Sequence, residues 1–370
     1  ESYNIAGLAT SWGMPAFKEN IAKRDSDAVR KFKAAGVIFL GKTNVPTLLD
    51  DFQTYNPIYG TTNNPWNKTR TCGGSSGGSA AALAAGFTGL EAGSDIGGSI
   101  RNPSHFCGVY GHKPTWGIVP MDGHSLRERA PVNDLSVCGP LGRSAEDLEL
   151  SLSIMQGPHP LDEPGWKLDL PPARQRRLAD FRVAIWADDP YAPVDSEIAA
   201  RVASLGEILA KCGCRVSDTA RPDINPQQPH IVYQNLLHCV MAAGVTPERY
   251  ERNQQYAAQY DRDDLSPVAV VSRARVLNHA EWVRYNARRQ YSRYIWREFF
   301  EDWDILICPQ MATTAFPHDH RKYSERSIEV NGQTQWYFQQ IFWSGLITAP
   351  LLPSTVIPTG PSSEGLPIGV

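Results

Sequence analysis

Long hydrophobic runs are absent from this chain of 370 residues. No stretch of 18 consecutive apolar residues occurs, so no membrane-spanning helix is predicted. A surplus of basic charge is absent as well: lysine and arginine number 36 and aspartate and glutamate 39, a formal net charge of −3. Without a basic surplus, nucleic acid is not an expected partner. The composition, 42% hydrophobic and 20% charged, is that of an ordinary globular protein with residues enough for a large core.

Cysteine is scarce and shows no regular spacing. The seven cysteines are odd in number and contain no C-x-x-C pair. The lone pair Cys212-Gly213-Cys214 stands beside an expected strand, and we interpret it as buried thiols rather than a metal site. This cysteine usage suits a reducing compartment, and a cytoplasmic location is expected.

Signatures of several other chemistries are also absent. No lysine follows the glycines in the pattern of a phosphate-binding loop. No serine of the glycine-rich region has a lysine three residues further on, as a penicillin-type site requires. His318 and His320 flank Asp319 without a third ligand, so no metal site is predicted. The sequence therefore predicts neither a metal nor an organic cofactor.

The most informative stretch runs from Cys72 to Pro114. It contains two glycine- and serine-rich segments, Gly73–Ser79 and Gly93–Ser99. Glycine allows backbone conformations and close approaches that other residues resist, and serine supplies hydroxyls. An acyl-transfer site needs a nucleophile, a proton relay and an oxyanion hole, which such segments can provide together. A flexible linker has a similar composition, but Ala80–Ala85 favours a helix that Gly86 ends.

An α/β-hydrolase elbow is an alternative for the first segment. The pattern G-x-S-x-G occurs twice, at Gly73–Gly77 and at Gly74–Gly78, which would make Ser75 or Ser76 the nucleophile. In a run so rich in glycine the match carries little weight. The elbow also needs a histidine, which only His279 or His318 could supply, and then by coincidence.

A series of ordered motifs resembles the amidase signature family. The resemblance runs over the whole chain and is weakest between residues 160 and 300. One departure is His112, where the family usually has leucine. The matching motifs are Gly41-Lys42-Thr43-Asn44, Tyr59–Trp66, Gly73–Ser79, Gly93–Arg101, Gly111–Thr115, Gly139–Asp147 and Gly365–Gly369.

The resemblance implies roles for individual residues. Ser99 corresponds to the nucleophile, and Ser75 to a bridging serine that the family holds through a cis Gly–Ser peptide. The backbone N–H groups of Ile96, Gly97, Gly98 and Ser99 correspond to the oxyanion hole. Three further residues correspond to groups that hold the two serine loops in place: Ser76, Asp95 and Arg101. Leu49 aligns with a residue that lines the acyl pocket in relatives, although a plain core position is an equal alternative.

The third catalytic member of the family is a lysine. The chain opens with Glu1–Thr10 in the family's lysine motif with its first residue removed, so the expected lysine would directly precede Glu1. We therefore expect a fragment that lacks a segment at each end. Lys18 is a substitute candidate that lacks the rest of the motif, and Lys42 is expected to be structural.

Hydrophobic periodicity indicates α/β organisation. A helix is expected over Asp25–Ala35, capped by Ser26, followed by a short buried strand over Val37–Leu40. Further expected helices and strands are Ala145–Met155, Arg182–Trp186, Asp195–Lys211, Gly213–Val216, Asn278–Phe300 and Asp304–Cys308. The resemblance implies an α/β/α fold with a mixed central sheet covered by helices. We expect one domain, with a signature core over residues 1–155 and 300–370 and a variable helical region over 156–300.

The expected activity is hydrolysis of a linear carboxamide through an acyl-enzyme on Ser99. Two alternatives share the fold: the amidotransferase subunit of the same family, and a binding protein without catalysis. The expected partner is a small-molecule amide, and a homodimer stays open. The substrate itself depends on residues 160–340, where the resemblance is least specific.

Overall fold

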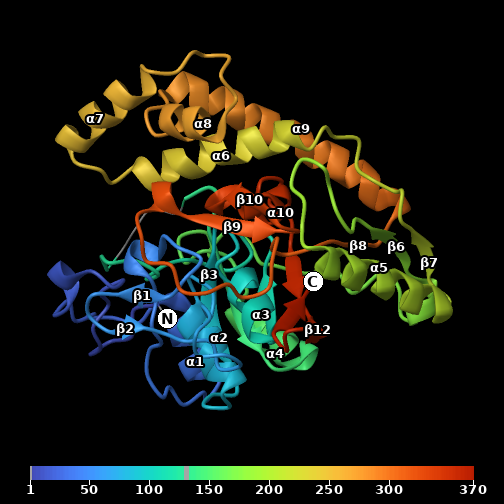
Figure 1. Ribbon diagram of the computed structural model, residues 1–370. Coiled ribbons are helices and arrows are strands. Elements are labelled where there is room, and N and C mark those ends of the chain that lie inside the picture. The colour runs from blue at the N-terminus through green and yellow to red at the C-terminus, as the bar shows by residue number, and fades with distance from the viewer. Residues whose placement is uncertain (1, 129–132) are drawn as a thin grey trace.

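A computed structural model describes residues 2–128 and 133–370. Figure 1 shows a layer of helices lying over a core of strands and shorter helices, with a second α/β unit beside that core. The helices are α1 Asp27–Ala34, α2 Gly77–Ala84, α3 Arg101–Cys107, α4 Ala145–Met155, α5 Ser196–Lys211, α6 Gln227–Ala242, α7 Pro247–Ala257, α8 Pro267–Ala274, α9 His279–Asp302 and α10 Ile341–Thr348.

The strands fall into a four-stranded antiparallel sheet in the order β11-β4-β5-β3, a three-stranded parallel sheet in the order β7-β6-β8, and three two-stranded hairpins. Strands and helices together confirm the expected α/β class. The strands are β1 Tyr55–Asn56, β2 Gly60–Thr61, β3 Glu91–Asp95, β4 Tyr110–Lys113, β5 Val137–Gly142, β6 Arg182–Ile185, β7 Arg215–Ser217, β8 Ile305–Ile307, β9 Ser327–Val330, β10 Gln333–Trp336, β11 Ser354–Val356, β12 Pro358–Pro361 and β13 Pro367–Gly369.

Local signals placed the first helix well and the segment after it badly. The Ser26 side chain accepts a hydrogen bond from the Val29 N–H and caps α1, as expected. The buried strand expected over Val37–Leu40 is wrong, because those residues form no strand and Ile38 is 84% exposed. Only Val37 and Phe39 pack against the cluster around α1. One face of this segment is therefore buried and the other faces water.

The glycine-rich region folds as the expected sequence of loop, helix, strand and loop. Helix α2 lies between the two glycine- and serine-rich segments and is almost wholly buried. Gly86 follows it with φ +73°, the left-handed conformation that ends many helices. Strand β3 then leads into the loop Ile96–Ile100, and α3 follows at once. Both serine segments therefore belong to tightly packed elements rather than to a linker.

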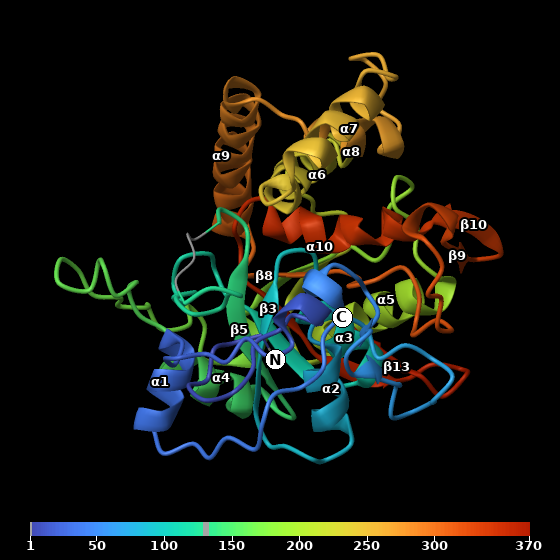
Figure 2. The ribbon, with the colours of Figure 1, turned by 90° about the vertical axis from the view of Figure 1, so that its left-hand side faces the viewer.

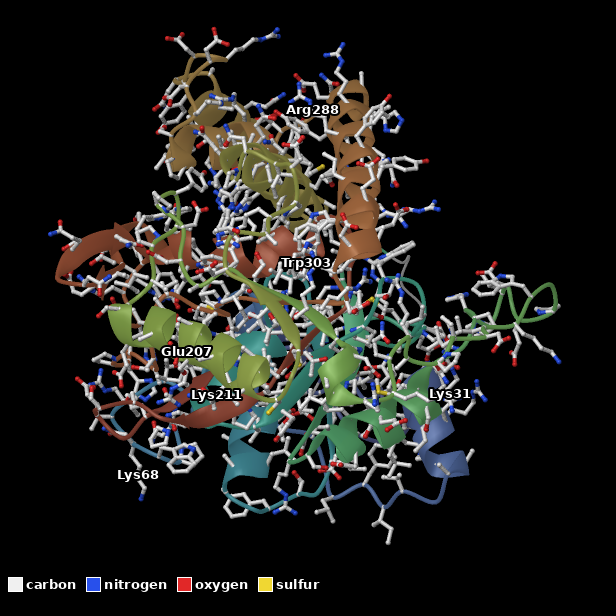
Figure 3. The ribbon with its side chains drawn as sticks, turned by 90° about the vertical axis from the view of Figure 1, so that its right-hand side faces the viewer. Lys31, Lys68, Glu207, Lys211, Arg288 and Trp303 are labelled. Atoms are coloured by element: carbon white, nitrogen blue, oxygen red, sulfur yellow. The ribbon has the colours of Figure 1, made fainter. Side chains whose placement is uncertain are left out.

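Helices α6–α9, here called the helical layer, lie above α10 and the β9–β10 hairpin (Figures 1 and 2). The longest of them, α9, begins with a capping box between Asn278 and Glu281. It ends beside the parallel sheet, where the Arg215 guanidinium lies 5.2 Å from the Trp303 ring centroid. Figure 3 shows Trp303 at this junction. The layer is thus fixed to the parallel sheet at one end and lies over the serine loops at the other.

One large hydrophobic cluster joins the parts of the chain. It contains Phe52 and Phe106 from the first half of the chain together with Ala184, Trp296 and Trp343 from the second. No helix among the described residues is both long and apolar enough to cross a membrane. The expectation of two buried thiols at Cys212 and Cys214 is only half right, because Cys212 is exposed just after α5.

Candidate active site

The two serine segments meet through their backbones. The Ser76 N–H donates to the Ser99 carbonyl at 3.0 Å, and the Ser94 N–H donates to the Ser76 hydroxyl at 3.3 Å. Ser99 is 7% exposed and Ser75 1%. Residues 24 positions apart in sequence are therefore brought together in one nearly dry location.

Ser75 is held by the backbone on both of its sides. The Gly74–Ser75 peptide is cis. The Gly74 N–H donates to Asn102 Oδ1 at 3.0 Å, and a Cβ added to Gly74 would lie 2.5 Å from the Asp51 carbonyl oxygen. Only glycine fits at this position. The Ser75 hydroxyl oxygen is buried and has no hydrogen-bond partner among the described residues.

A buried carboxylate shapes the loop that precedes Ser99. Asp95 accepts hydrogen bonds from the N–H groups of Gly98 at 2.9 Å and Ile100 at 3.1 Å. Gly98 has φ +111° and a Cβ there would lie 2.4 Å from Ser344 Oγ. Since the Gly98 N–H is bound to Asp95, the other expected oxyanion donors are the N–H groups of Ile96, Gly97 and Ser99.

Arg101 neutralises Asp95 and ties the loop to α10. Its Nε and Nη2 atoms donate to Asp95 at 3.0 and 2.8 Å, and both side chains are fully buried. Its remaining donors reach the Ser344 carbonyl and the Thr348 hydroxyl on α10. Burial by itself would raise the pKa of Asp95, but Arg101, Lys113 and the Gly98 N–H together hold that pKa below its usual value. Asp95 is therefore a carboxylate at neutral pH.

Lys113 lies behind this pair at the end of β4. Its Nζ donates to the carbonyls of Pro114 at 3.0 Å and Leu352 at 2.7 Å, and the side chain is completely buried. Burial and the nearby Arg101 charge lower the pKa of Lys113 to about 7, against the opposing effect of Asp95. Lys113 thus joins β4 to the segment after α10.

The helical layer reaches the site through Tyr233 on α6. Its hydroxyl donates to the Ile96 carbonyl at 2.8 Å, and its ring packs so closely on Gly345 of α10 that a Cβ there would lie 2.3 Å from it. Gln310 contributes from another direction by donating to Ser344 Oγ at 2.9 Å. The loop before Ser99 is thus enclosed by α6, α10 and the segment after β8.

The two lysines considered as substitutes lie in ordinary surroundings. Lys18 is exposed at the end of a short 3-10 helix. Lys42 donates from Nζ to the Ala9 carbonyl at 2.9 Å and the Thr10 hydroxyl at 2.7 Å. Tyr3, near the start of the chain, donates its hydroxyl to the Gly93 carbonyl at 2.6 Å. The N-terminal segment therefore passes beside the second serine segment.

The histidines considered for other chemistries lie elsewhere. His279 begins α9, is exposed and stacks on Trp282. His318 and His320 line a surface cavity of about 820 Å³ whose lining contains neither Ser75 nor Ser99. Within residues 2–128 and 133–370, no group of three His, Cys, Asp or Glu side chains could hold a metal ion. The hydrolase elbow also lacks its strand, because loop residues rather than a strand precede Ser76 and α2.

Leu49 ends a 3-10 turn and is half-buried, with φ +62°. Its neighbour Leu48 also has positive φ, +56°. The turn therefore positions residues 48–51 along the side of the Gly74–Ser75 peptide, close to the place expected of an acyl-pocket residue.

Sequence reasoning missed several residues that surround the site. Tyr233, Gln310, Ser344 and Thr348 lie far from the glycine-rich region in sequence, and Tyr233 and Thr348 are 137 and 247 positions from their partners in the loop. Tyr233 stands in a helix rich in polar and aromatic residues, and no local pattern distinguishes it. Only the folded chain brings these side chains to the loop before Ser99.

Comparisons with known proteins agree with one another. A family model described as Amidase matches residues 1–370. The chain is 33% identical to the indoleacetamide hydrolase of Bradyrhizobium diazoefficiens (strain USDA 110), covering 100% of this chain and 68% of that protein. It is 33% identical to a hydrolase of Pseudomonas sp. (strain ADP) that acts on 1-carboxybiuret, covering 94% and 73%, and 29% identical to one component of the glutamyl-tRNA(Gln) amidotransferase of Gloeothece citriformis, covering 98% and 76%. The solved structure of 6-aminohexanoate cyclic dimer hydrolase with its substrate superposes with a TM-score of 0.76 at 26% identity, covering 100% of this chain and 78% of that one.

Proposed function

Because this chain belongs to the Amidase family, we propose that it hydrolyses a carboxamide through an acyl-enzyme formed on Ser99. Carboxamide hydrolysis is the activity of the amide hydrolases that it resembles along its whole length. The observation that carries the assignment of residues is the contact between the two serine segments, with Ser76 donating to the Ser99 carbonyl beside the buried hydroxyl of Ser75.

In the proposed reaction, Ser75 accepts the proton of Ser99 while the Ser99 oxygen attacks the amide carbonyl. The negative charge on the tetrahedral intermediate is stabilised by the N–H groups of the loop Ile96–Ser99. Asp95 and Arg101 position that loop, and a loop fixed in advance stabilises developing charge without having to reorganise. The relay then protonates the leaving amine, and water hydrolyses the acyl-enzyme.

We propose that a lysine directly before Glu1 accepts the proton of Ser75. The resemblance implies a lysine at that place. Two observations support it: Ser75 Oγ is buried with no partner among the described residues, and Tyr3 anchors the N-terminal segment on Gly93. Lys18, being exposed, is not favoured.

Labelling and substitution test this assignment in the full-length protein. A fluorophosphonate should label Ser99, and Ser99→Ala should lower turnover of a simple aryl amide by about 10⁴-fold or more without changing the circular dichroism spectrum. Ser76→Ala serves as the control that keeps both expected relay serines. Label on Ser76 would favour the hydrolase elbow, and no label on a folded protein would favour a binding protein without catalysis.

The amidotransferase component is the second candidate, since a relative of that kind covers nearly the whole chain. Such a protein would work with a partner enzyme. Amidase turnover by the purified protein alone argues for the hydrolase, while turnover only after a partner is added argues for the amidotransferase.

We also propose a cytoplasmic location. All seven cysteines are free, which supports a reducing compartment. Fractionation of cells that produce the full-length protein tests this, and recovery from an oxidising compartment would contradict it.

A further inference from the structure

The segment that borders Ser75 continues into a group of charged side chains. Asp51, whose carbonyl abuts Gly74, is buried and fully paired. Its carboxylate accepts from Arg326 Nη1 at 2.6 Å and from the Tyr337 hydroxyl at 2.7 Å. Arg326 also donates to the Tyr55 hydroxyl at 2.6 Å. Asp51 and Arg326 thus cancel each other's charge.

Asp50, the preceding residue, has an unsatisfied carboxylate. The Tyr323 hydroxyl donates to its backbone carbonyl, but no described residue hydrogen-bonds or ion-pairs with its side chain, which is exposed. Surrounding protein still desolvates the carboxyl. That desolvation and the Asp51 charge raise the pKa of Asp50 to about 7, and Arg275 and then Arg249 act in the opposite direction. The carboxyl group therefore lies in an enclosed place that water can still enter.

The groups that face Asp50 from the helical layer are two arginines. Arg275 is the C-cap of α8 and Arg249 lies on α7. Both side chains are exposed, and neither forms an ion pair with any described residue. Burial by neighbouring protein lowers the pKa of Arg275, Asp50 acts to raise it and Arg249 to lower it. The two guanidinium groups and the Asp50 carboxylate therefore lie within electrostatic reach of one another.

The remaining neighbours add no charge. His238 on α6 is neutral, because burial, Arg275 and His230 lower its pKa to about 3. Tyr323 is also neutral, since burial and the carboxylates of Asp50 and Asp51 raise its pKa. Two cations thus face one unpaired anion, a net charge of one positive unit. Guanidinium groups without partners are the protein groups best suited to bind a carboxylate, which they grip with two parallel hydrogen bonds.

We propose that Arg275 and Arg249 form a subsite for a carboxylate at the far end of the substrate, with Asp50 as the counter-ion that they hold when the subsite is empty. The inference rests on the proposed function, because the subsite lies beside the segment 48–51, on the side expected for the acyl group. The substrate class that follows is a monoamide of a dicarboxylic acid.

Helix geometry sets the scale of the substrate. Tyr233, which contacts the loop before Ser99, and His238, which lies near Arg275, are five residues apart on α6. At 1.5 Å per residue this is about 7.5 Å along the helix. An acyl chain with four methylene groups between its two carbonyl carbons has a comparable length. A shorter acid would leave its carboxylate short of the arginines.

Three 4-nitroanilides with the same four methylene groups test the subsite in the full-length protein. They end in a carboxylate (adipoyl), a methyl group (hexanoyl) or an ammonium group (5-aminopentanoyl). The expected order of kcat/KM places the adipoyl compound first and the ammonium compound last. Arg275→Gln should lower the ratio of adipoyl to hexanoyl kcat/KM by about tenfold, mainly through KM, because one charge-assisted contact is lost.

Asp50→Asn should act in the opposite direction and raise that ratio, because it removes the competing anion. Arg252→Gln, an exposed arginine on the same helix as Arg249, is the matched control and should leave the ratio unchanged. So should Arg288→Gln, on α9 (Figure 3), where the guanidinium lies over the Tyr285 ring. A preference for the ammonium compound that Asp50→Asn abolishes would overturn the proposal.

Binding to Ser99→Ala separates this inference from the proposed function. Calorimetric titration of that variant with the adipoyl and hexanoyl anilides needs no turnover. Tighter binding of the adipoyl compound that Arg275→Gln removes supports the subsite even if the wild-type protein hydrolyses neither compound, in which case only the proposed function fails. Equal binding of the two compounds overturns the subsite whatever the turnover.

Discussion

At the scale of single residues, the site depends on buried charge that is completely paired. Asp95 receives both loop N–H groups and the Arg101 guanidinium, and Arg101 uses its other donors on α10. Breaking such a pair leaves one charge buried without a partner, which costs far more than the pair contributes when intact. Residues that never touch substrate therefore determine whether the loop before Ser99 keeps its shape.

Asp95→Asn should lower the free energy of unfolding by about 3–5 kcal/mol, the usual cost of an unpaired buried charge. It should also lower kcat, because the loop loses two N–H acceptors. Urea denaturation and steady-state kinetics measure both effects. Asp122→Asn breaks a more exposed pair with Arg24 and should cost about 1 kcal/mol or less. Equal losses in the two variants would contradict this account.

Lys113 should make stability depend on pH. Its folded pKa of about 7 lies below the unfolded value of 10.5, so between these values the unfolded chain binds more protons and stability rises with pH. Lys113→Met removes this contribution. The difference in unfolding free energy, wild type minus variant, should grow by about 2 kcal/mol between pH 7 and pH 9. A constant difference in urea titrations would show that Lys113 stays protonated over that range.

At the scale of elements, α6 and α10 hold the loop before Ser99 between them. Tyr233 on α6 bonds the loop directly, and α10 presents Gly345 to the Tyr233 ring and Ser344 to Arg101. The helical layer therefore serves the reaction by positioning as well as by covering. Its outer helices carry the arginines proposed to select the substrate.

Tyr233→Phe should keep the packing on Gly345 and lose only the hydrogen bond to Ile96. One hydrogen bond is worth about 1 kcal/mol in stability, and a less rigid oxyanion loop should lower kcat by about tenfold with little change in KM. Tyr294→Phe, on the exposed face of α9, is the control for removing a tyrosine hydroxyl. A higher KM with an unchanged kcat would mean that Tyr233 binds substrate instead.

At the scale of the whole molecule, one hydrophobic cluster connects parts that are distant in sequence. It links Phe52 and Phe106 beside the serine segments with Ala184 in the parallel sheet and Trp296 in α9. Elements that share such a core gain most of their stability from one another. The two sheets and the helical layer should therefore not unfold separately.

Thermal unfolding should accordingly show one transition, with the same midpoint by tryptophan fluorescence and by far-ultraviolet circular dichroism. Trp296→Ala, which empties a buried site at the base of the helical layer, should lower both midpoints together. The expected cost is about 3–5 kcal/mol. Two separated midpoints in either protein would show that the helical layer is an independent unit.

The sequence by itself determined the features that depend on near neighbours. The Ser26 cap, the end of α2 at Gly86, helix α4 and the order of elements around Ser75 and Ser99 could all be predicted. They depend on hydrogen bonds and backbone preferences within a few residues, and these are the same wherever the segment lies. The ordered motifs then indicated the family, because they record many such positions at once.

Only the tertiary structure decided which distant groups meet. Arg101 reaches Ser344 and Thr348 across 243 and 247 positions, Tyr233 reaches Ile96 across 137, and Asp50 faces Arg249 and Arg275 from other helices. It also decided against a strand at residues 37–40, whose apolar side chains are only half covered. Such contacts depend on the path of the whole chain, and no local pattern carries that information.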